Sequence, residues 1–370
     1  MNIHIQKEHF EENLTTASRF ISSKISSVQS IQGAYLKTDK DHIVLTTTNL
    51  NDFFYVKIPA VIEEEGEVIF DLKKTAEFIS LLGVGEIVIK FQEGSFVVSQ
   101  GKNKGYFNTF PIEDFPTLPE ISGNQIEIGK DIVEKLPLVF FSSSKEEARP
   151  VLTGVYFGSN GGETEIVSTD GFRLSLLRPT KNKASSLGII IPSHILNEAV
   201  RQSKTTNSFL FTVSDTEKII KFDLDNAVIF SRVIEGEFPP YEKVVPKSYT
   251  TKIILNKAEM LRNIKLVSVF AREQGDIILC DIKKEGLTLR PKTIQGNDTQ
   301  IFMEYVEMEG EELKIAFNYR YIIDFLNAVS SETITLECTT STAPAVFRDP
   351  KSEEYLHIIM PLRTEETTDQ

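Results

Sequence analysis

Residues 313–338 read LKIAFNYRYIIDFLNAVSSETITLEC, a stretch that predicts a strand, a helix and a second strand. Asn318 suits the start of the helix, because its side-chain oxygen can accept hydrogen bonds from backbone N–H groups that lack partners in the first turn. The apolar residues from Ile322 to Val329 recur at i, i+3, i+4 and i+7, which is one face of a helix. Residues 333–338 then alternate as a β-branched strand.

The same strand–helix–strand pattern occurs twice more, at residues 68–91 and 189–213. The predicted residues at the helix starts are Asp71, Ser193 and Asn318, and the second strand begins 15, 16 and 15 positions after them. Three matching units at nearly equal spacing predict a chain built from a threefold repeat.

A second repeated unit, a strand followed by a helix, precedes each of these three copies. It covers residues 3–21, 126–143 and 253–271. Each copy has a lysine at the same place, namely Lys7, Lys130 and Lys257. In the second copy Pro137 falls inside the predicted helix, where the missing N–H should kink or shorten it.

The repeats predict an α+β protein of three similar domains, each with two helices packed on antiparallel sheets. The predicted domains are residues 1–124, 125–250 and 251–370, with proline-rich boundaries and an acidic tail at 364–370 that we expect to be disordered. Several short strands fill the space between the repeated helical units.

Composition excludes several classes of protein. The net charge of −13 argues against a protein that coats nucleic acid through a broadly basic surface. The first residues lack a signal-peptide core and no apolar run reaches the length of a membrane span, so a cytoplasmic location is expected. The two cysteines, Cys280 and Cys338, have no metal-binding spacing and are interpreted as buried free thiols.

Motifs for catalysis, cofactors and metals are nearly absent. Residues 142–145 contain one S-x-x-K match, without the S-D-N and K-T-G partners of the acyl-enzyme class. The five histidines are scattered, and no glycine-rich phosphate loop occurs. The Asp170-Gly171 pair predicts a hairpin turn. We therefore expect no catalytic residues, no cofactor and no metal, and interpret the chain as a binding or structural protein.

Charge is unevenly distributed. The six repeated helices carry a net +5, which leaves −18 for the rest of the chain. Such helices gathered on one surface could meet phosphates without reading bases. Mixed charge on solvated helix faces is the simpler interpretation.

Four stretches, in this order and at these spacings, resemble the bacterial DNA polymerase III beta subunit family, the replicative sliding clamps. They are residues 151–177, 235–247, 317–329 and 355–363, and the resemblance extends over residues 1–363. It implies a head-to-tail homodimeric ring of six domains, with helices lining the hole and sheets outside. The implied partners are double-stranded DNA without sequence preference, the replicative polymerase, an ATP-driven clamp loader and other proteins with short clamp-binding peptides.

The resemblance also implies three sets of site residues. The implied peptide-binding pocket is lined by Leu152, Thr169, Gly171, Phe172, Arg173, Leu174, Pro239, Lys243, Val244, Asn318, Tyr321, Ile358, Ile359, Met360, Pro361, Leu362 and Arg363. The candidate DNA-facing charges are Lys7, Arg19, Lys24, Lys130, Lys145, Arg149, Lys204, Arg262, Lys265 and Arg272. The implied dimer interface contains Tyr106, Phe107, Thr109, Val269 and Phe270.

Two departures and two alternatives accompany this interpretation. Lys243 stands where the family often has arginine, so a planar donor is lost. The tail 364–370 extends past the usual end beside the pocket, where it could shield the groove in part. One alternative is a repeat-built scaffold that binds peptides but never DNA. The other is a hydrolase that uses the S-x-x-K motif.

Overall fold

The computed structural model describes residues 1–22, 29–92, 94–123, 125–160, 162–179, 187–203, 208–214, 216–292 and 299–365. Lys24, Lys204 and residues 366–370 of the tail therefore lie outside the described residues. The chain forms two compact units, Met1–Lys130 with Glu198–Val233, and Asp131–Asn197 with Ile234–Gln370. Within the described part, no helix has the length and apolar character needed to span a membrane.

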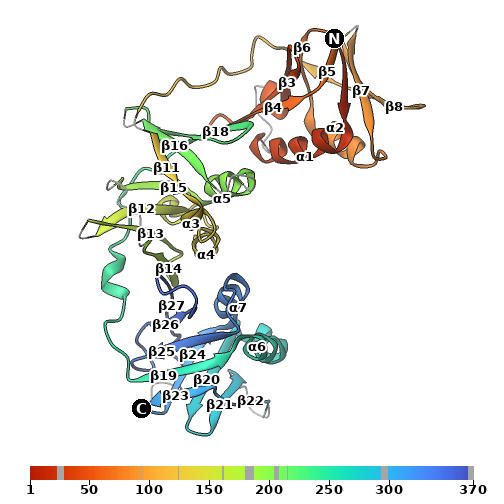
Figure 1. Ribbon diagram of the computed structural model, residues 1–370. Helices are drawn as coiled ribbons and strands as arrows, with labels where there is room; N and C mark the ends of the chain where they lie inside the picture. Colours follow the sequence, from red (N-terminus) through yellow and green to blue (C-terminus); the bar gives the residue numbers. More distant parts are fainter. Residues whose placement is uncertain are drawn as a thin grey trace. The chain divides into compact units, whose positions relative to one another are not determined.

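The first unit contains two antiparallel sheets and two helices that lie against each other, α1 (Lys7–Ala17) and α2 (Leu72–Ser80) (Figure 1). The five-stranded sheet has the order β5 (Val61–Glu64), β1 (Asn2–Gln6), β7 (Glu86–Gln92), β8 (Ser95–Gln100) and β9 (Asn103–Phe107). The nine-stranded sheet has the order β10 (Thr109–Phe110), β6 (Glu67–Asp71), β2 (Gly33–Asp39), β3 (His42–Thr48), β4 (Asp52–Pro59), β18 (Ala227–Arg232), β17 (Ile219–Asp223), β16 (Phe209–Ser214) and β11 (Gln125–Ile128).

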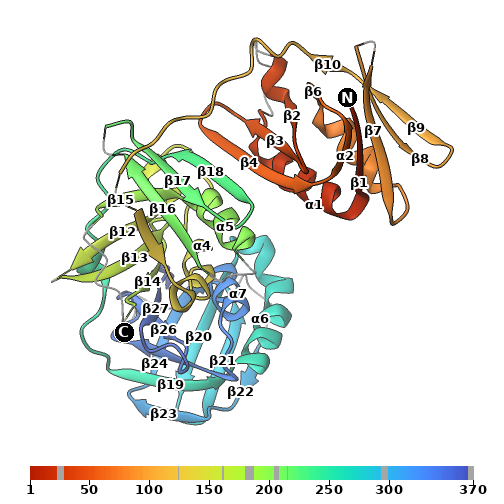
Figure 2. The same cartoon turned by 45° about the horizontal axis from the view of Figure 1, so that its top comes forward.

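The second unit also contains two antiparallel sheets, and its helices α6 (Lys257–Ala271) and α7 (Tyr319–Ala328) pack side by side (Figure 2). The nine-stranded sheet has the order β15 (Ile189–Pro192), β12 (Gly154–Asn160), β13 (Glu163–Thr169), β14 (Arg173–Leu177), β27 (Tyr355–Ile359), β26 (Ala345–Arg348), β25 (Thr333–Cys338), β19 (Thr251–Asn256) and β23 (Glu307–Gly310). The four-stranded sheet has the order β22 (Ile301–Met303), β21 (Gly286–Pro291), β20 (Ile277–Lys283) and β24 (Leu313–Asn318).

The predicted strand–helix–strand repeat is confirmed as β6–α2–β7, β15–α5–β16 and β24–α7–β25, with α5 at Ser193–Gln202. The Asp71 carboxylate accepts a hydrogen bond from the Lys74 N–H, and the Asn318 side chain accepts one from the Arg320 N–H, so both act as N-caps. The predicted effect of proline is also confirmed. The helix of the second copy is divided into α3 (Lys130–Val133) and α4, which starts at Pro137 and ends at Phe140.

The strand order repeats with the helices. The series β1–β7–β8–β9 corresponds to β11–β16–β17–β18 and to β19–β25–β26–β27. The series β6–β2–β3–β4 corresponds to β15–β12–β13–β14 and to β24–β20–β21–β22. Successive repeats are joined by pairing of two end strands. Strand β4 of the first repeat pairs with β18 of the second, and β14 of the second repeat pairs with β27 of the third. These two junctions make both nine-stranded sheets continuous.

The same turn leads into both junction strands. The Thr48 hydroxyl donates to the Asp52 carbonyl and accepts from the Leu50 N–H, at 2.8 and 2.9 Å. The Thr169 hydroxyl does the same with the Arg173 carbonyl and the Gly171 N–H, at 2.6 and 3.0 Å. The third residue of each turn, counted from its threonine, has a positive φ, which is +79° at Leu50 and +92° at Gly171. Glycine adopts this conformation freely, whereas the Cβ of leucine is crowded in it.

A buried polar network crosses the β14–β27 junction. The Ser175 hydroxyl lies 3.0 Å from His357 Nδ1, 3.2 Å from the Tyr355 hydroxyl and 2.7 Å from the Ser142 hydroxyl. His357 is fully buried beside the rings of Phe141 and Phe325. Burial, and then the positive charge of Arg173, lower the pKa of His357 well below its usual value. The imidazole is therefore neutral in the folded chain.

Both cysteines are buried free thiols, as predicted. Burial raises the pKa of both thiols above the usual value.

Relief of the backbone strain at Leu50 should stabilise the chain. The Leu50 side chain is 50% exposed, so its replacement removes little buried apolar surface. We expect Leu50→Asn to raise the free energy of unfolding by about 1 kcal/mol, because asparagine tolerates positive φ. Urea midpoints will measure the change. Leu50→Ala also shortens the side chain but lacks the carboxamide that lets asparagine tolerate positive φ, so it is the matched control; a gain in Leu50→Ala equal to that in Leu50→Asn would contradict the argument.

Acid should destabilise the junction through His357. Below about pH 6.5 the unfolded chain takes up a proton at this imidazole that the folded chain does not, so the free energy of unfolding falls as the pH falls towards the depressed folded pKa. We expect His357→Phe, which can occupy the aromatic site, to make the urea midpoint less dependent on pH in this window. Parallel pH profiles for the native and variant chains would show that His357 does not contribute.

Candidate functional site

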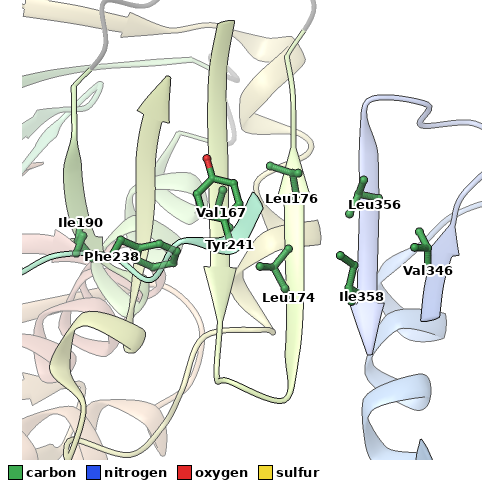
Figure 3. Close-up of a cluster of buried hydrophobic side chains, with 9 residues drawn as sticks. All are labelled: Val167, Leu174, Leu176, Ile190, Phe238, Tyr241, Val346, Leu356 and Ile358. Carbon is green, nitrogen blue, oxygen red and sulfur yellow. The ribbon is translucent and has the colours of Figure 1, made fainter. Parts of the chain in front are cut away.

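A cluster of buried apolar side chains lies at the β14–β27 junction, and we call it the junction cluster (Figure 3). Strands β13, β14, β15, β26 and β27 and the segment after β18 supply its members, which are Val167, Leu174, Leu176, Ile190, Phe238, Tyr241, Val346, Leu356 and Ile358. Phe238 stacks on Tyr156 at 5.0 Å, and the Tyr241 hydroxyl donates to the buried Glu165 carboxylate. The segment that connects the second and third repeats is thereby held on the sheet, with Val244 packed against the cluster.

The residues of the predicted peptide-binding pocket all belong to the second unit. Six of them are buried, namely Leu152, Thr169, Arg173, Leu174, Ile358 and Ile359. The others are exposed or partly exposed, namely Gly171, Phe172, Pro239, Lys243, Val244, Asn318, Tyr321, Met360, Pro361, Leu362 and Arg363.

Backbone contacts join the two sides of this set. Leu174 pairs with Ile358 and Arg173 with Ile359 across the junction. The Met360 N–H donates to the Phe172 carbonyl at 2.8 Å. This bond places the turn before β14 next to the segment after β27.

Arg173 is buried and paired with two carboxylates. Its side chain is 9% exposed, with Nε 3.0 Å from Asp170 Oδ2 and an Nη nitrogen 2.6 Å from Asp324 Oδ2. The guanidinium also lies 4.6 Å from the centre of the Tyr321 ring. Arg173 therefore holds the turn before β14 and the first turns of α7 together, and it orients Tyr321. Sequence analysis did not identify Asp324, because its role depends on a partner 151 positions away.

A cavity of about 520 Å³ adjoins this set and shares Phe172, Arg173 and Tyr321 with it. We call it the side cavity. Its remaining lining comes from the segment after α4, the turn before β14 and α7, namely Ser143, Ser144, Lys145, Glu146, Asp170, Arg320, Ile323 and Asp324.

The predicted interface residues lie at two places. Tyr106, on the edge strand β9, is 70% exposed, and Phe107 beside it packs on Phe78. Thr109 lies in β10, where its hydroxyl donates to the Gly94 carbonyl. Val269 and Phe270 are exposed near the end of α6.

Strand β22 is a further candidate that the sequence analysis missed. It is the edge strand of the four-stranded sheet, and its Phe302 is 53% exposed. The sequence signalled a strand here, but edge position depends on the pairing of the whole sheet.

The candidate DNA-facing charges differ in accessibility. Six are exposed, namely Lys130, Lys145, Arg149, Arg262, Lys265 and Arg272. Arg19 is exposed in part, and its guanidinium donates to Glu198. Lys7 is only 7% exposed and its ammonium donates to Glu11, so the prediction that Lys7 faces DNA is wrong. Its burial follows from the first turn of α1 packing on the core.

The hydrolase interpretation fails on the position of its serine. Ser142 is fully buried and its hydroxyl shares a hydrogen bond with Ser175 at 2.7 Å. A nucleophile must reach a substrate, and this hydroxyl cannot. In the described ranges, no cluster of histidine, cysteine or acidic residues could hold a metal ion.

Comparisons with known proteins agree over nearly the whole chain. Residues 1–119, 128–240 and 242–363 match the N-terminal, central and C-terminal domains of the DNA polymerase III beta subunit. The beta sliding clamp of Halalkalibacterium halodurans is 27% identical, with 98% of this chain and 100% of the relative covered. The beta sliding clamp of Bacillus subtilis is 26% identical with the same coverage.

Solved structures share the fold. The DNA polymerase III beta subunit of Thermotoga maritima aligns with a TM-score of 0.88 at 20% identity, covering 98% of this chain and 99% of that one. The sliding clamp of Bacillus subtilis aligns with a TM-score of 0.86 at 24% identity and the same coverage. These likenesses show the three-domain clamp fold. The chain belongs to the bacterial DNA polymerase III beta subunit family.

Proposed function

We propose that this chain is a sliding clamp, a processivity factor that encircles duplex DNA and tethers the replicative polymerase. The observation that carries the proposal is the pair of open edges left by the repeat. Each of the two junctions within the chain pairs β4 or its equivalent β14 with β18 or β27, which are the equivalents of β9. In the described part of the chain, two strands lack this kind of partner. They are β22 of the third repeat, which is equivalent to β4, and β9 of the first repeat, which is equivalent to β18.

Two copies can satisfy both edges at once. If β22 of each copy pairs with β9 of the other, two equivalent head-to-tail contacts related by a twofold axis close six domains into a ring. Exposed apolar side chains on both surfaces support this pairing, since large exposed apolar groups often mark interfaces. The proposed interface comprises Tyr106, Phe107, Thr109, Val269 and Phe270, with Phe302 added.

A closed ring does not need to grip DNA tightly. Release requires opening of an interface, so weak contacts to phosphates suffice and allow sliding. We assign these contacts to the six exposed cations Lys130, Lys145, Arg149, Arg262, Lys265 and Arg272. The proposed domains are residues 1–124, 125–250 and 251–370. The polymerase is then held at high effective concentration near its primer end.

We place the docking site for partner proteins, including the polymerase and a clamp loader, in a groove beside the junction cluster. The predicted lining is mostly apolar with a few polar groups, which suits a short peptide that carries leucine and phenylalanine. The clamp itself is proposed to be non-catalytic, to need no cofactor, and to act in the cytoplasm, where bacterial DNA is copied.

The ring requires a dimer. Light scattering should give about twice 41.7 kDa at micromolar concentration. Phe270→Glu and Phe302→Glu should each yield monomers, because a charge buried in the seam has no partner. Val61→Glu, on the opposite edge of the sheet that contains β9, is the control and should remain dimeric. A stable native monomer would exclude the ring.

Binding to DNA should depend on topology. After loading by an ATP-driven clamp loader, the protein should remain on nicked circular duplex through a high-salt wash and leave once the circle is cut. Without a loader, binding to short linear duplex should be weak and fall steeply with salt. Gel filtration of the labelled complex will measure retention. Tight, salt-resistant binding to short linear duplex would contradict the mechanism.

The groove should bind a peptide with a Gln-x-x-Leu-Phe pattern in the micromolar range, which corresponds to about 8 kcal/mol. Met360→Ala should weaken binding by about tenfold, since the flexible thioether adapts to the apolar ligand. Fluorescence anisotropy with a labelled peptide will measure both affinities. Met308→Ala, on β23, is the control. Equal affinity in native and Met360→Ala chains would show that the groove is assigned incorrectly.

A further inference from the structure

The side cavity adjoins the proposed peptide groove, and the two share the same wall. Phe172 is exposed and Tyr321 is partly exposed, and both line the side cavity as well as the groove. A peptide in the groove can therefore extend one of its flanking side chains into the side cavity. The question is which side chain this second compartment suits.

The two arginines of the side cavity are already neutralised. Arg173 contacts Asp170 and Asp324, so these three groups together carry one net negative charge. The Arg320 guanidinium contacts both oxygens of Asp276, with Nε 2.7 Å from Oδ2. Arg173 is thus buried in its ion pairs, and Arg320 is paired with a carboxylate that does not line the side cavity.

The acidic groups are more accessible than the arginines. Asp324 is 43% exposed, and only its Oδ2 is held by Arg173. Glu146 is exposed, and its carboxylate has no ion pair with another described residue. Lys145 beside it is exposed as well and balances one negative charge. The three cations and three carboxylates of the lining sum to zero; because Arg320 is paired with Asp276 outside the lining, the other five charged residues carry one net negative charge.

The walls suit a long aliphatic stem. Phe172, Tyr321 and Ile323 supply apolar surface, while the carboxylates lie nearby on the turn and on α7. Lysine and arginine bury their methylene groups along such surfaces and keep the charged head at polar groups. Complementary charge at the edge of an interface contributes mainly to specificity.

We propose that the side cavity is a specificity subsite for a basic residue that flanks the docking peptide of a partner protein. This inference rests on the proposed peptide groove. The cation would contact Asp324 Oδ1 and Glu146, and its stem would lie along Tyr321 and Ile323. Partners with a lysine or arginine at the matching distance from the Leu-Phe pair would be preferred over partners with an acidic residue there.

The test uses the full-length dimer and labelled peptides with one Gln-x-x-Leu-Phe core. Lysine, alanine or glutamate is placed in turn at each of several flanking positions. At one position the lysine peptide should bind about threefold more tightly than the alanine peptide, and the glutamate peptide more weakly, as expected for a partly exposed ion pair. Raised salt should reduce this ratio.

Variants separate the subsite from the groove. The double variant Glu146→Gln/Asp324→Asn should abolish the lysine-to-alanine ratio, and Lys145→Ala should preserve or increase it. The ratio is the readout because a general disturbance of Arg173 and Tyr321 changes both affinities alike. A ratio of one at every position in the native chain, or a ratio kept in the double variant, would overturn the subsite while alanine-peptide binding still supports the groove. Failure of the alanine peptide to bind would overturn the groove and the subsite together.

Discussion

The antiparallel pairing of β4 with β18 and of β14 with β27 is the interaction on which the rest of the structure depends. It joins successive repeats by main-chain hydrogen bonds, and it brings strands from distant parts of the chain together in each of the two nine-stranded sheets. The junction cluster, the Ser175–His357 network and the proposed groove all lie at the second of these junctions. The junction is therefore both a structural joint and the place where a partner peptide is proposed to bind.

The two junctions use one turn but differ in the side chains they carry. The threonine that closes the turn is present in both, with the same pair of hydrogen bonds. Where the second junction has Arg173, the first has Asp52, which accepts a hydrogen bond from Ser231. Where the second has Met360 after the last strand, the first has Arg232, whose N–H donates to the Asn51 carbonyl. The same backbone arrangement thus carries Asp52 and Arg232 at the first junction and Arg173 and Met360 at the second.

Local features of the fold were predictable from the sequence, because helix caps, apolar periodicity and proline act over a few residues. The roles of Asp71, Asn318 and Pro137 are examples. Strand pairing between repeats was not predictable, since it depends on contacts between distant segments. The same applies to Arg173, whose burial requires Asp324 on a different repeat. Lys7 is a different case: Glu11 lies four positions further on, and this helix spacing could have indicated an ion pair rather than a free charge.

The edge strand β22 is short. Ile301–Met303 has three residues, whereas five residue pairs join β4 to β18 and five join β14 to β27. In a ring closed through β22, the seam between subunits would thus have fewer main-chain hydrogen bonds than any junction within a subunit. Under mechanical load such a ring is expected to part at the seam first, with both subunits still folded. In such a ring, the unequal lengths of these strands would define the order in which the assembly comes apart.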